Sequence, residues 1–184
     1  MGFVNLNALK KKYPAGTMKE NVDNLIEYDI YHSLLRGSIT ASSKVKSILG
    51  EVPEQFLEWI KVCDGGLLFD TVMLSTTEHD SILNLDFDTY EELNSDNGKA
   101  FFKLPEGFVI FALRSYGDPL CFDVDEPDGR VYLWNVENEV FDEYWESFED
   151  WMSDEICDAV NLIADDVLEP LGVKLDEIEE SDNE

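Results

Sequence analysis

Positive charge is scarce in this sequence of 184 residues. It has 13 Lys and Arg against 41 Asp and Glu, and a formal net charge of -28 at pH 7. Residues 1–50 carry seven basic and four acidic side chains, a net charge of +3, whereas the remainder carries -31. Such a field repels nucleic acids and anionic membranes, speeds association with a basic protein and opposes self-association. We therefore expect a monomer with a basic protein partner and no contact with nucleic acid or membrane, although the same charge also serves solubility alone.

Long apolar runs, secretion signals and paired cysteines are also missing. No run reaches the length of about 18 apolar residues that spans a membrane. In residues 1–16 the lysines follow the apolar residues, unlike a secretory signal, and Leu6 stands where a myristoylation signal has Ser or Thr. The three cysteines, Cys63, Cys121 and Cys157, are widely spaced and form no CxxC motif. This usage predicts reduced core thiols in a cytoplasmic protein.

Catalytic motifs are equally scarce. The two histidines, His32 and His79, have no zinc-ligand spacing to each other or to a cysteine. The sequence contains no nucleophile elbow, no phosphate-binding Walker loop and no Rossmann glycine pattern. Acidic pairs are too frequent among 41 acids to identify a catalytic pair. The sequence therefore predicts a binding protein rather than an enzyme, with no catalytic residue, cofactor or metal. A hydrolase ranks third, well behind two kinds of binding protein, an inhibitor and a scaffold.

The stretch from Asp123 to Gly129, DVDEPDG, has the acid content of a calcium loop. An EF-hand loop counted from Asp123 fails at positions 5, 6 and 12, which are Pro127, Asp128 and Trp134. Proline restricts φ and glycine accepts positive φ, and both stand here between two hydrophobic runs. We expect a tight turn between strands.

Helical patterns precede and follow the predicted strands. Residues 33–49 are expected to be helical, although Gly37 and Thr40 weaken the pattern. A clearer helix begins at Pro53, with Phe56, Leu57 and Ile60 on one face and Cys63 as a further candidate for it, and is expected to end at Gly65-Gly66. Residues 88–102 predict a short helix. A terminal helix begins at Ser147, with Asp150 in capping-box position. Its apolar positions are Phe148, Trp151, Met152, Ile156, Ala159, Ile163 and Val167.

Short strands occupy the middle of the chain. Residues 67–75 and 81–87 predict two strands around a polar turn, and FVIFALR (108–114) predicts a buried one. Three further strands, 119–124, 130–136 and 139–145, follow after tight turns and indicate an antiparallel meander. Helices, then a sheet, then a helix predict a single α+β domain.

The order of short motifs resembles the SUKH superfamily, named for fungal cell-wall-synthesis regulators and similar bacterial immunity proteins. The resemblance covers about residues 50–155. It has a Pro-aromatic helix ending in Asp-Gly-Gly, a strand with IFA (110–112), a Gly-Asp turn, a strand with CFD, a glycine turn, and a terminal Ser-Phe-x-x-Trp helix start. The matching residues are Pro53, Phe56, Trp59, Gly65, Gly66, Gly117, Asp118, Phe122, Asp123, Gly129, Phe148 and Trp151.

The resemblance implies a bent, mainly antiparallel sheet of about five to six strands with helices packed around it. It divides the chain into an N-terminal extension of unclear role (1–32), a SUKH-like domain (33–170) and an acidic tail (171–184). It also implies a protein that works by binding. Bacterial members commonly neutralise nuclease or deaminase toxins, whereas fungal members act as scaffolds in cell-wall signalling. No catalytic residue or cofactor is carried over, and we expect the matching residues to build the fold.

A dense acidic stretch is the candidate binding surface. No Lys or Arg occurs from Val131 to Val173. A toxin that grips nucleic acid needs a basic cleft, which an acidic surface with aromatic anchors such as Tyr144 and Trp145 would fill. The alternative is a solvated helix face with Trp145 in the core. The candidate residues are Glu137, Glu139, Asp142, Glu143, Tyr144, Glu146, Glu149, Asp150, Asp154, Glu155 and Asp158.

Overall fold

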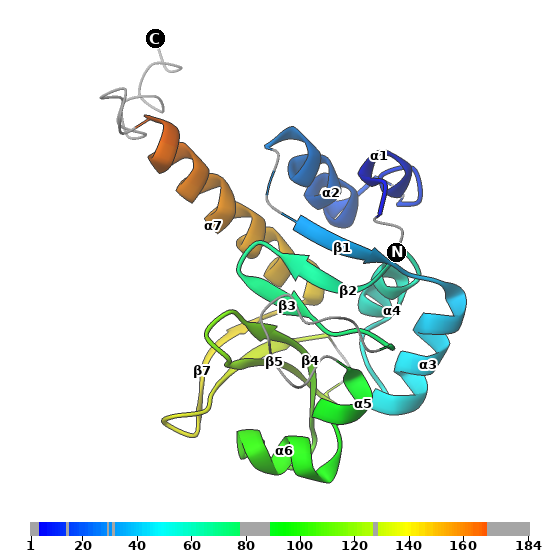
Figure 1. The fold of residues 1–184 in the computed structure, drawn as a ribbon, viewed down its shortest axis with the longest axis vertical. Helices are drawn as coiled ribbons and strands as arrows, with labels where there is room; N and C mark the ends of the chain where they lie inside the picture. The colour runs from blue at the N-terminus through cyan, green and yellow to red at the C-terminus, as the bar shows by residue number, and fades with distance from the viewer. Residues whose placement is uncertain are drawn as a thin grey trace.

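Seven strands form one antiparallel sheet in chain order, as the computed structural model shows (Figure 1). The structure describes residues 4–13, 15–28, 30, 32–77, 89–126 and 129–168, without the side chains of 32 and 163–168. The strands are β1 (His32–Arg36), β2 (Cys63–Leu68), β3 (Thr71–Met73), β4 (Phe108–Arg114), β5 (Pro119–Asp123), β6 (Val131–Asn135) and β7 (Val140–Trp145). The predicted α+β class is confirmed, with more strands than the five to six expected.

Helices precede, interrupt and follow the sheet. They are α1 (Leu6–Leu9), α2 (Thr17–Glu27), α3 (Ile39–Leu49), α4 (Glu54–Ile60), α5 (Tyr90–Leu93), α6 (Asp96–Phe102) and α7 (Phe148–Leu168). In Figure 1, α7 lies beside α2, and the two helices pack together. No helix within the described part of the chain is long and apolar enough to cross a membrane.

The second half of the sheet is the predicted meander, from β4 to β7. Each strand pairs antiparallel with the next. Register shifts interrupt the pairs β1–β2, β4–β5 and β6–β7. Such irregularities bend a sheet and increase its twist, so one concave face encloses the core. The predicted turn before β6 is partly outside the described residues, and its last residue, Gly129, has φ +97°.

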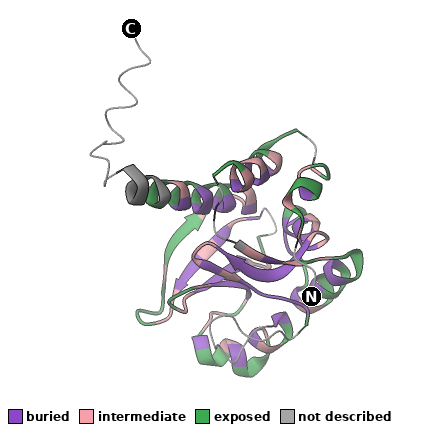
Figure 2. Cartoon of the chain, turned by 45° about the horizontal axis from the view of Figure 1, so that its top comes forward, coloured by how far each residue is buried: buried purple, intermediate pink, exposed green. Residues whose placement is uncertain are grey.

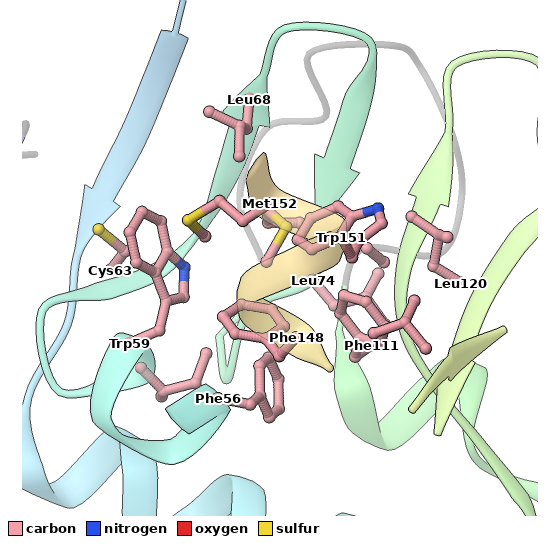
Figure 3. Close-up of a cluster of buried hydrophobic side chains, with 14 of the residues drawn as sticks. Phe56, Trp59, Cys63, Leu68, Leu74, Phe111, Leu120, Phe148, Trp151 and Met152 are labelled. Carbon is pink, nitrogen blue, oxygen red and sulfur yellow. The ribbon is translucent and has the colours of Figure 1, made fainter. Parts of the chain in front are cut away.

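An aromatic core lies between this face of the sheet and the helices α4 and α7 (Figure 3). The rings of Phe111 on β4 and Phe122 on β5 stack at 4.4 Å between centroids. Phe56 of α4 contacts both of these rings, and Phe148 of α7 lies 5.3 Å from Phe56. Trp151 meets Phe111 edge-on at 5.3 Å. All five side chains are buried, so motif residues far apart in the sequence form one cluster.

The start of α7 confirms the predicted cap and apolar stripe. Ser147 Oγ accepts a hydrogen bond from Asp150 N at 3.1 Å and donates one to Asp150 Oδ2 at 2.8 Å. A hydroxyl at this position satisfies an N–H group that the helix leaves unpaired. The described members of the stripe are all buried: Phe148, Trp151, Met152, Ile156 and Ala159.

The expected helix over 33–49 is wrong in its first part. Residues 32–36 form β1, which pairs with β2, and α3 begins only at Ile39 after the cap Ser38. Gly37 makes the corner between them. A Cβ there would lie 2.0 Å from the carbonyl oxygen of Ile60, so only glycine fits against α4. The glycine that weakened the helical pattern therefore marks its real boundary.

The expected helix end at Gly65-Gly66 is also wrong. The helix α4 ends at Ile60, and both glycines lie inside β2, together with Cys63. A Cβ on Gly66 would lie 2.1 Å from the carbonyl oxygen of Ser33 on β1, and a Cβ on Gly65 would lie 2.5 Å from Cβ of Ser75. Both glycines are required because neighbouring segments of the chain lie too close for a Cβ, and not because a helix ends there.

Three smaller expectations also change. Residues 67–75 are not one strand, because β2 ends at Leu68 and a turn leads into β3. Residues 88–102 contain two short helices, α5 and α6, and the second ends in left-handed Lys103. Cys63 and Cys121 are buried as predicted, but Cys157 is exposed. The predicted strand 81–87, His79 and the tail 171–184 lie outside the described residues.

The N-terminal segment contributes to the same core. Its buried side chains are Leu9, Met18, Val22, Leu25 and Ile30. Asn21 is also buried, and its Nδ2 donates a hydrogen bond to the carbonyl oxygen of Glu149 on α7 at 3.2 Å. The division of the chain at residues 32 and 170 stays a prediction.

Candidate functional site

The candidate site lies on β7 and α7. The strand β7 is the last strand of the described sheet, and in Figure 2 it is mostly exposed, unlike the purple central strands. Its outer edge has no partner strand among the described residues, and acids occupy both faces of it. Trp145 of β7 is hydrogen-bonded to Asp154 of α7, and Glu143 and Asp158 line the same cleft, so these acids of the strand and of the helix lie in one region.

Most of the predicted acids are exposed. We name as the β7–α7 acidic surface the exposed ones: Glu137, Glu139, Asp142, Glu143, Glu146, Asp150, Asp154 and Asp158. Glu149 is half-buried and lines a separate pocket with Tyr13 and Gly16, on the α2 side of α7. Carboxylates at this density repel one another in the free protein and are stabilised by a cationic partner.

Glu155 does not belong to this surface, although the sequence predicted it there. Its exposed fraction is 2%, and its carboxylate forms an ion pair with Arg114 of β4. Thr71 Oγ1 donates a hydrogen bond to Glu155 Oε1 at 2.8 Å, and Arg114 Nη1 donates one to Thr71 Oγ1 at 3.1 Å. Burial raises the pKa of Glu155, and Arg114 opposes that shift. Glu155 connects α7 to the sheet instead of meeting a partner.

Neighbouring cations pair with one acid at each end of β7. Glu139 pairs with Lys103, and Arg130 Nε donates to Glu146 Oε2 at 3.1 Å. These two cations come from outside the stretch without Lys or Arg, so sequence proximity did not predict either pair. Exposed pairs of this kind contribute little stability, about 0–1 kcal/mol.

The two aromatic anchors lie on opposite faces of β7. Tyr144 is exposed over 61% of its surface, its ring centroid lies 6.4 Å from that of Tyr132, and the guanidinium of Arg130 lies 6.0 Å from it. Trp145 is half-buried against the core, and its Nε1 donates a hydrogen bond to Asp154 Oδ2 at 2.9 Å. Tyr144 is therefore available to a partner, whereas Trp145 joins the strand to α7.

A cleft of about 690 Å³ lies between α7 and the sheet, where residues of β4, β6 and β7 and of the turns after β2 and β4 line it. Its lining residues are Phe69, Asp70, Arg114, Tyr116, Leu133, Glu143, Glu155, Asp158, Asn161 and Leu162. Sequence reasoning found Glu143, Glu155 and Asp158 but missed Asp70, Arg114 and Tyr116. One signal was present, since Arg114 ends an otherwise apolar strand, where a cation needs a buried partner.

The family-motif residues mostly build the fold. Pro53, Trp59, Gly65 and Gly66 are buried, as are the aromatic core residues described above. Asp118 Oδ1 accepts a hydrogen bond from Val136 N at 3.1 Å, and the carbonyl oxygen of Asp118 accepts one from Arg114 N at 2.8 Å. Gly117 has φ +103°, the conformation that its turn requires. Asp123 Oδ1 accepts a bond from Asp125 N at 2.9 Å, as in an Asx turn.

Groups suited to covalent or metal chemistry are not gathered in the described part of the chain. Burial raises the pKa of the Cys63 and Cys121 thiols, which keeps both protonated. Within residues that the structure describes, no three His, Cys, Asp or Glu side chains could hold a metal ion together. The arrangement offers carboxylates, a cleft and exposed aromatic rings, which are the elements of a binding surface.

A family model described as SMI1-KNR4 cell-wall, of the SUKH_6 family, matches residues 46–152. The match covers more than half of the chain and runs from α3 to the first turns of α7, so it includes the aromatic core, β7 and the start of the acidic part of α7. No curated protein matches the chain.

Proposed function

Because the chain belongs to the SUKH family, described as SMI1-KNR4 cell-wall, we propose that it is an immunity protein that binds and neutralises a basic toxin. Members of this family are in general non-enzymatic binding proteins with immunity or regulatory functions. The observation that carries the proposal is the β7–α7 acidic surface, which borders a cleft and an exposed tyrosine. The toxins that it would suit are nucleases or deaminases, since their substrate sites are basic.

Physical chemistry connects this surface to inhibition. Exposed carboxylates at the rim of an interface steer a basic partner and raise the association rate, while buried anchors contribute most of the affinity. This attraction is screened over about 8 Å at physiological ionic strength, so association is expected to slow as salt is added. An inhibitor of this kind would occupy the basic substrate cleft of the toxin with carboxylates in place of phosphates.

A second function remains in competition, and the description of the family model favours it. A cell-wall regulator of the fungal type would act as a scaffold with several partners of modest affinity. In that case the acidity would serve solubility, and the acids would show no special distribution around one partner.

Affinity capture separates the two functions. The full chain serves as bait in a lysate of its native host, at low and at high salt, and mass spectrometry identifies bound proteins. One stoichiometric basic partner that salt releases supports the inhibitor, and it then supplies the complex for kinetic measurements. Several substoichiometric partners support the scaffold.

Charge reversal then tests the surface itself. We expect the variant with Glu137, Asp142, Glu143 and Asp158 replaced by lysine to associate about tenfold or more slowly with the captured partner, because it reverses the steering field. A matched control replaces four exposed acids elsewhere, Glu51, Glu54, Glu91 and Glu106, and has the same net charge. Equal on-rates in the two folded variants would mean that net charge matters but the β7–α7 acidic surface does not.

A further inference from the structure

The cleft beside α7 has a neutral floor and an acidic mouth. Arg114 and Glu155 neutralise each other at its base, where their side chains are 12% and 2% exposed. The remaining ionisable carboxylates of the lining are Asp70, Glu143 and Asp158, from the β2–β3 turn, β7 and α7. Among the residues that the structure describes, no further Lys or Arg lines it. Three chain segments therefore converge on one hollow with an unbalanced charge of three carboxylates.

The apolar part of the lining is unusually accessible. Tyr116 is 65% exposed and Leu162 is 53% exposed, although both are large hydrophobic side chains. Together with Phe69 they provide apolar walls beside the carboxylates. An exposed apolar rim around a hollow is typical of a binding site, because covering apolar surface removes it from water and so lowers the free energy.

The field inside the cleft acts on Tyr116. Burial raises the pKa of this tyrosine, Arg114 lowers it, and Asp118, Asp70 and Glu143 raise it further. Tyr116 lines the cleft together with Asp70 and Glu143, so carboxylates from the β2–β3 turn and from β7 act on its phenol. A positive charge placed next to this ring would meet the same carboxylates.

We propose that this cleft holds an arginine side chain of the basic partner, together with the short loop that carries it. The inference rests on the proposed function and deepens it by naming the anchor. A guanidinium is planar and weakly hydrated, stacks on aromatic rings and donates to carboxylates in a fork. These properties match the Tyr116 ring and the carboxylates of the lining. A volume of about 690 Å³ lies within the range of small-ligand sites and leaves room for residues on each side of the arginine.

Two peptides test the anchor without the partner. The full chain, labelled for NMR, is titrated with acetyl-Gly-Arg-Gly-amide and with the citrulline peptide, which keeps the shape and removes the charge. We expect the arginine peptide alone to shift the amide signals of Tyr116 and Leu162, with a dissociation constant in the millimolar range. No binding, equal binding of the two peptides, or shifts elsewhere on the surface would overturn the proposal.

A matched pair of variants tests the carboxylates. Asp70→Asn with Asp158→Asn is expected to weaken arginine-peptide binding about fivefold, because each exposed ion pair contributes about a twofold to fivefold factor at most. The control, Glu91→Gln with Glu106→Gln, removes the same charge from exposed acids outside the lining and should stay within about twofold of the wild type. Equal losses would assign the effect to net charge and overturn the cleft.

The captured partner separates this inference from the proposed function. If a basic toxin binds and the Asp70/Asp158 variant dissociates faster than its control, both stand. If the toxin binds both variants equally, the immunity function stands and the cleft is not the anchor. If no basic partner exists but the arginine peptide binds selectively in the cleft, the immunity function fails and the chemistry of the cleft stands.

Discussion

The two sides of α7 face two regions with opposite chemistry. One side packs Phe148, Trp151 and Ile156 into the aromatic core, where rings from four elements contact one another. The other side presents Asp154 and Asp158 to solvent, in the β7–α7 acidic surface. Apolar spacing of 3.6 residues predicts the first side from local sequence, because burial leaves few alternatives. Acid content alone does not predict the second, since solvent accepts a carboxylate almost anywhere.

Glu155 shows where that division fails. It has the same residue type as its exposed neighbours and lies one position before Ile156, on the buried side of the helix. What separates it from them is Arg114, 41 residues earlier in the chain, together with Thr71. The difference between a surface acid and a structural acid is therefore the presence of a partner that only the fold supplies.

Truncation of one ring in each region is expected to give the largest difference. Trp151→Ala should lower the free energy of unfolding by about 3–5 kcal/mol, because it removes a fully buried ring from the core. Tyr144→Ala, on the acidic surface, should cost below about 1 kcal/mol. Urea denaturation followed by circular dichroism measures both. Comparable losses would mean that the edge of β7 is as tightly packed as the core.

A pair of glycine substitutions sharpens the contrast between motif and surface. Gly66→Ala should lower the free energy of unfolding by about 2–3 kcal/mol, because φ is +115° and the new Cβ would meet the Ser33 carbonyl oxygen. Gly50→Ala, at φ +84° with nothing within 4 Å, should lose about 1–2 kcal/mol from the positive φ alone. The same unfolding measurement decides. A similar cost at both positions would show that β1 moves away from β2 to accept the methyl group.

The pH dependence of stability tests the buried acid, with a smaller effect. The pKa of Glu155 is raised above 4.5 in the folded state, so the folded protein holds its proton more tightly than the unfolded chain. The stabilisation from this group is complete below 4.5 and is lost as pH rises through the raised pKa. Relative to Glu155→Gln, the wild type should therefore lose stability as pH rises from below 4.5.

Glu143→Gln is the control for that measurement. It removes one exposed carboxylate and leaves Glu155 in place. Relative to Glu155→Gln, this variant should therefore lose stability with rising pH as the wild type does. A stability difference that stays flat with pH would mean that Arg114 and Thr71 compensate the cost of burial in full.

Much of the fold followed from local patterns. The strands from Phe108 to Trp145, the cap at Ser147 and the buried stripe of α7 needed only alternation, turn residues and helical spacing. The two errors in helix boundaries came at glycines. They appeared to weaken or end helices, but each is required by a close neighbour elsewhere in the chain. Gly37 lies against Ile60, Gly65 against Ser75 and Gly66 against Ser33, and local helix patterns do not contain these contacts.

The sequence by itself determined the charge, the strands from β4 to β7 and the buried stripe of α7, because each depends on composition or on residues within a few turns of one another. Tertiary structure alone decided which acids remain on the surface and which one pairs with Arg114. It also decided that Asp70, Tyr116, Glu143 and Asp158 surround one cleft. The physical reason is that electrostatic environment depends on distance in space, and these residues come from segments that only the folded sheet and α7 bring together.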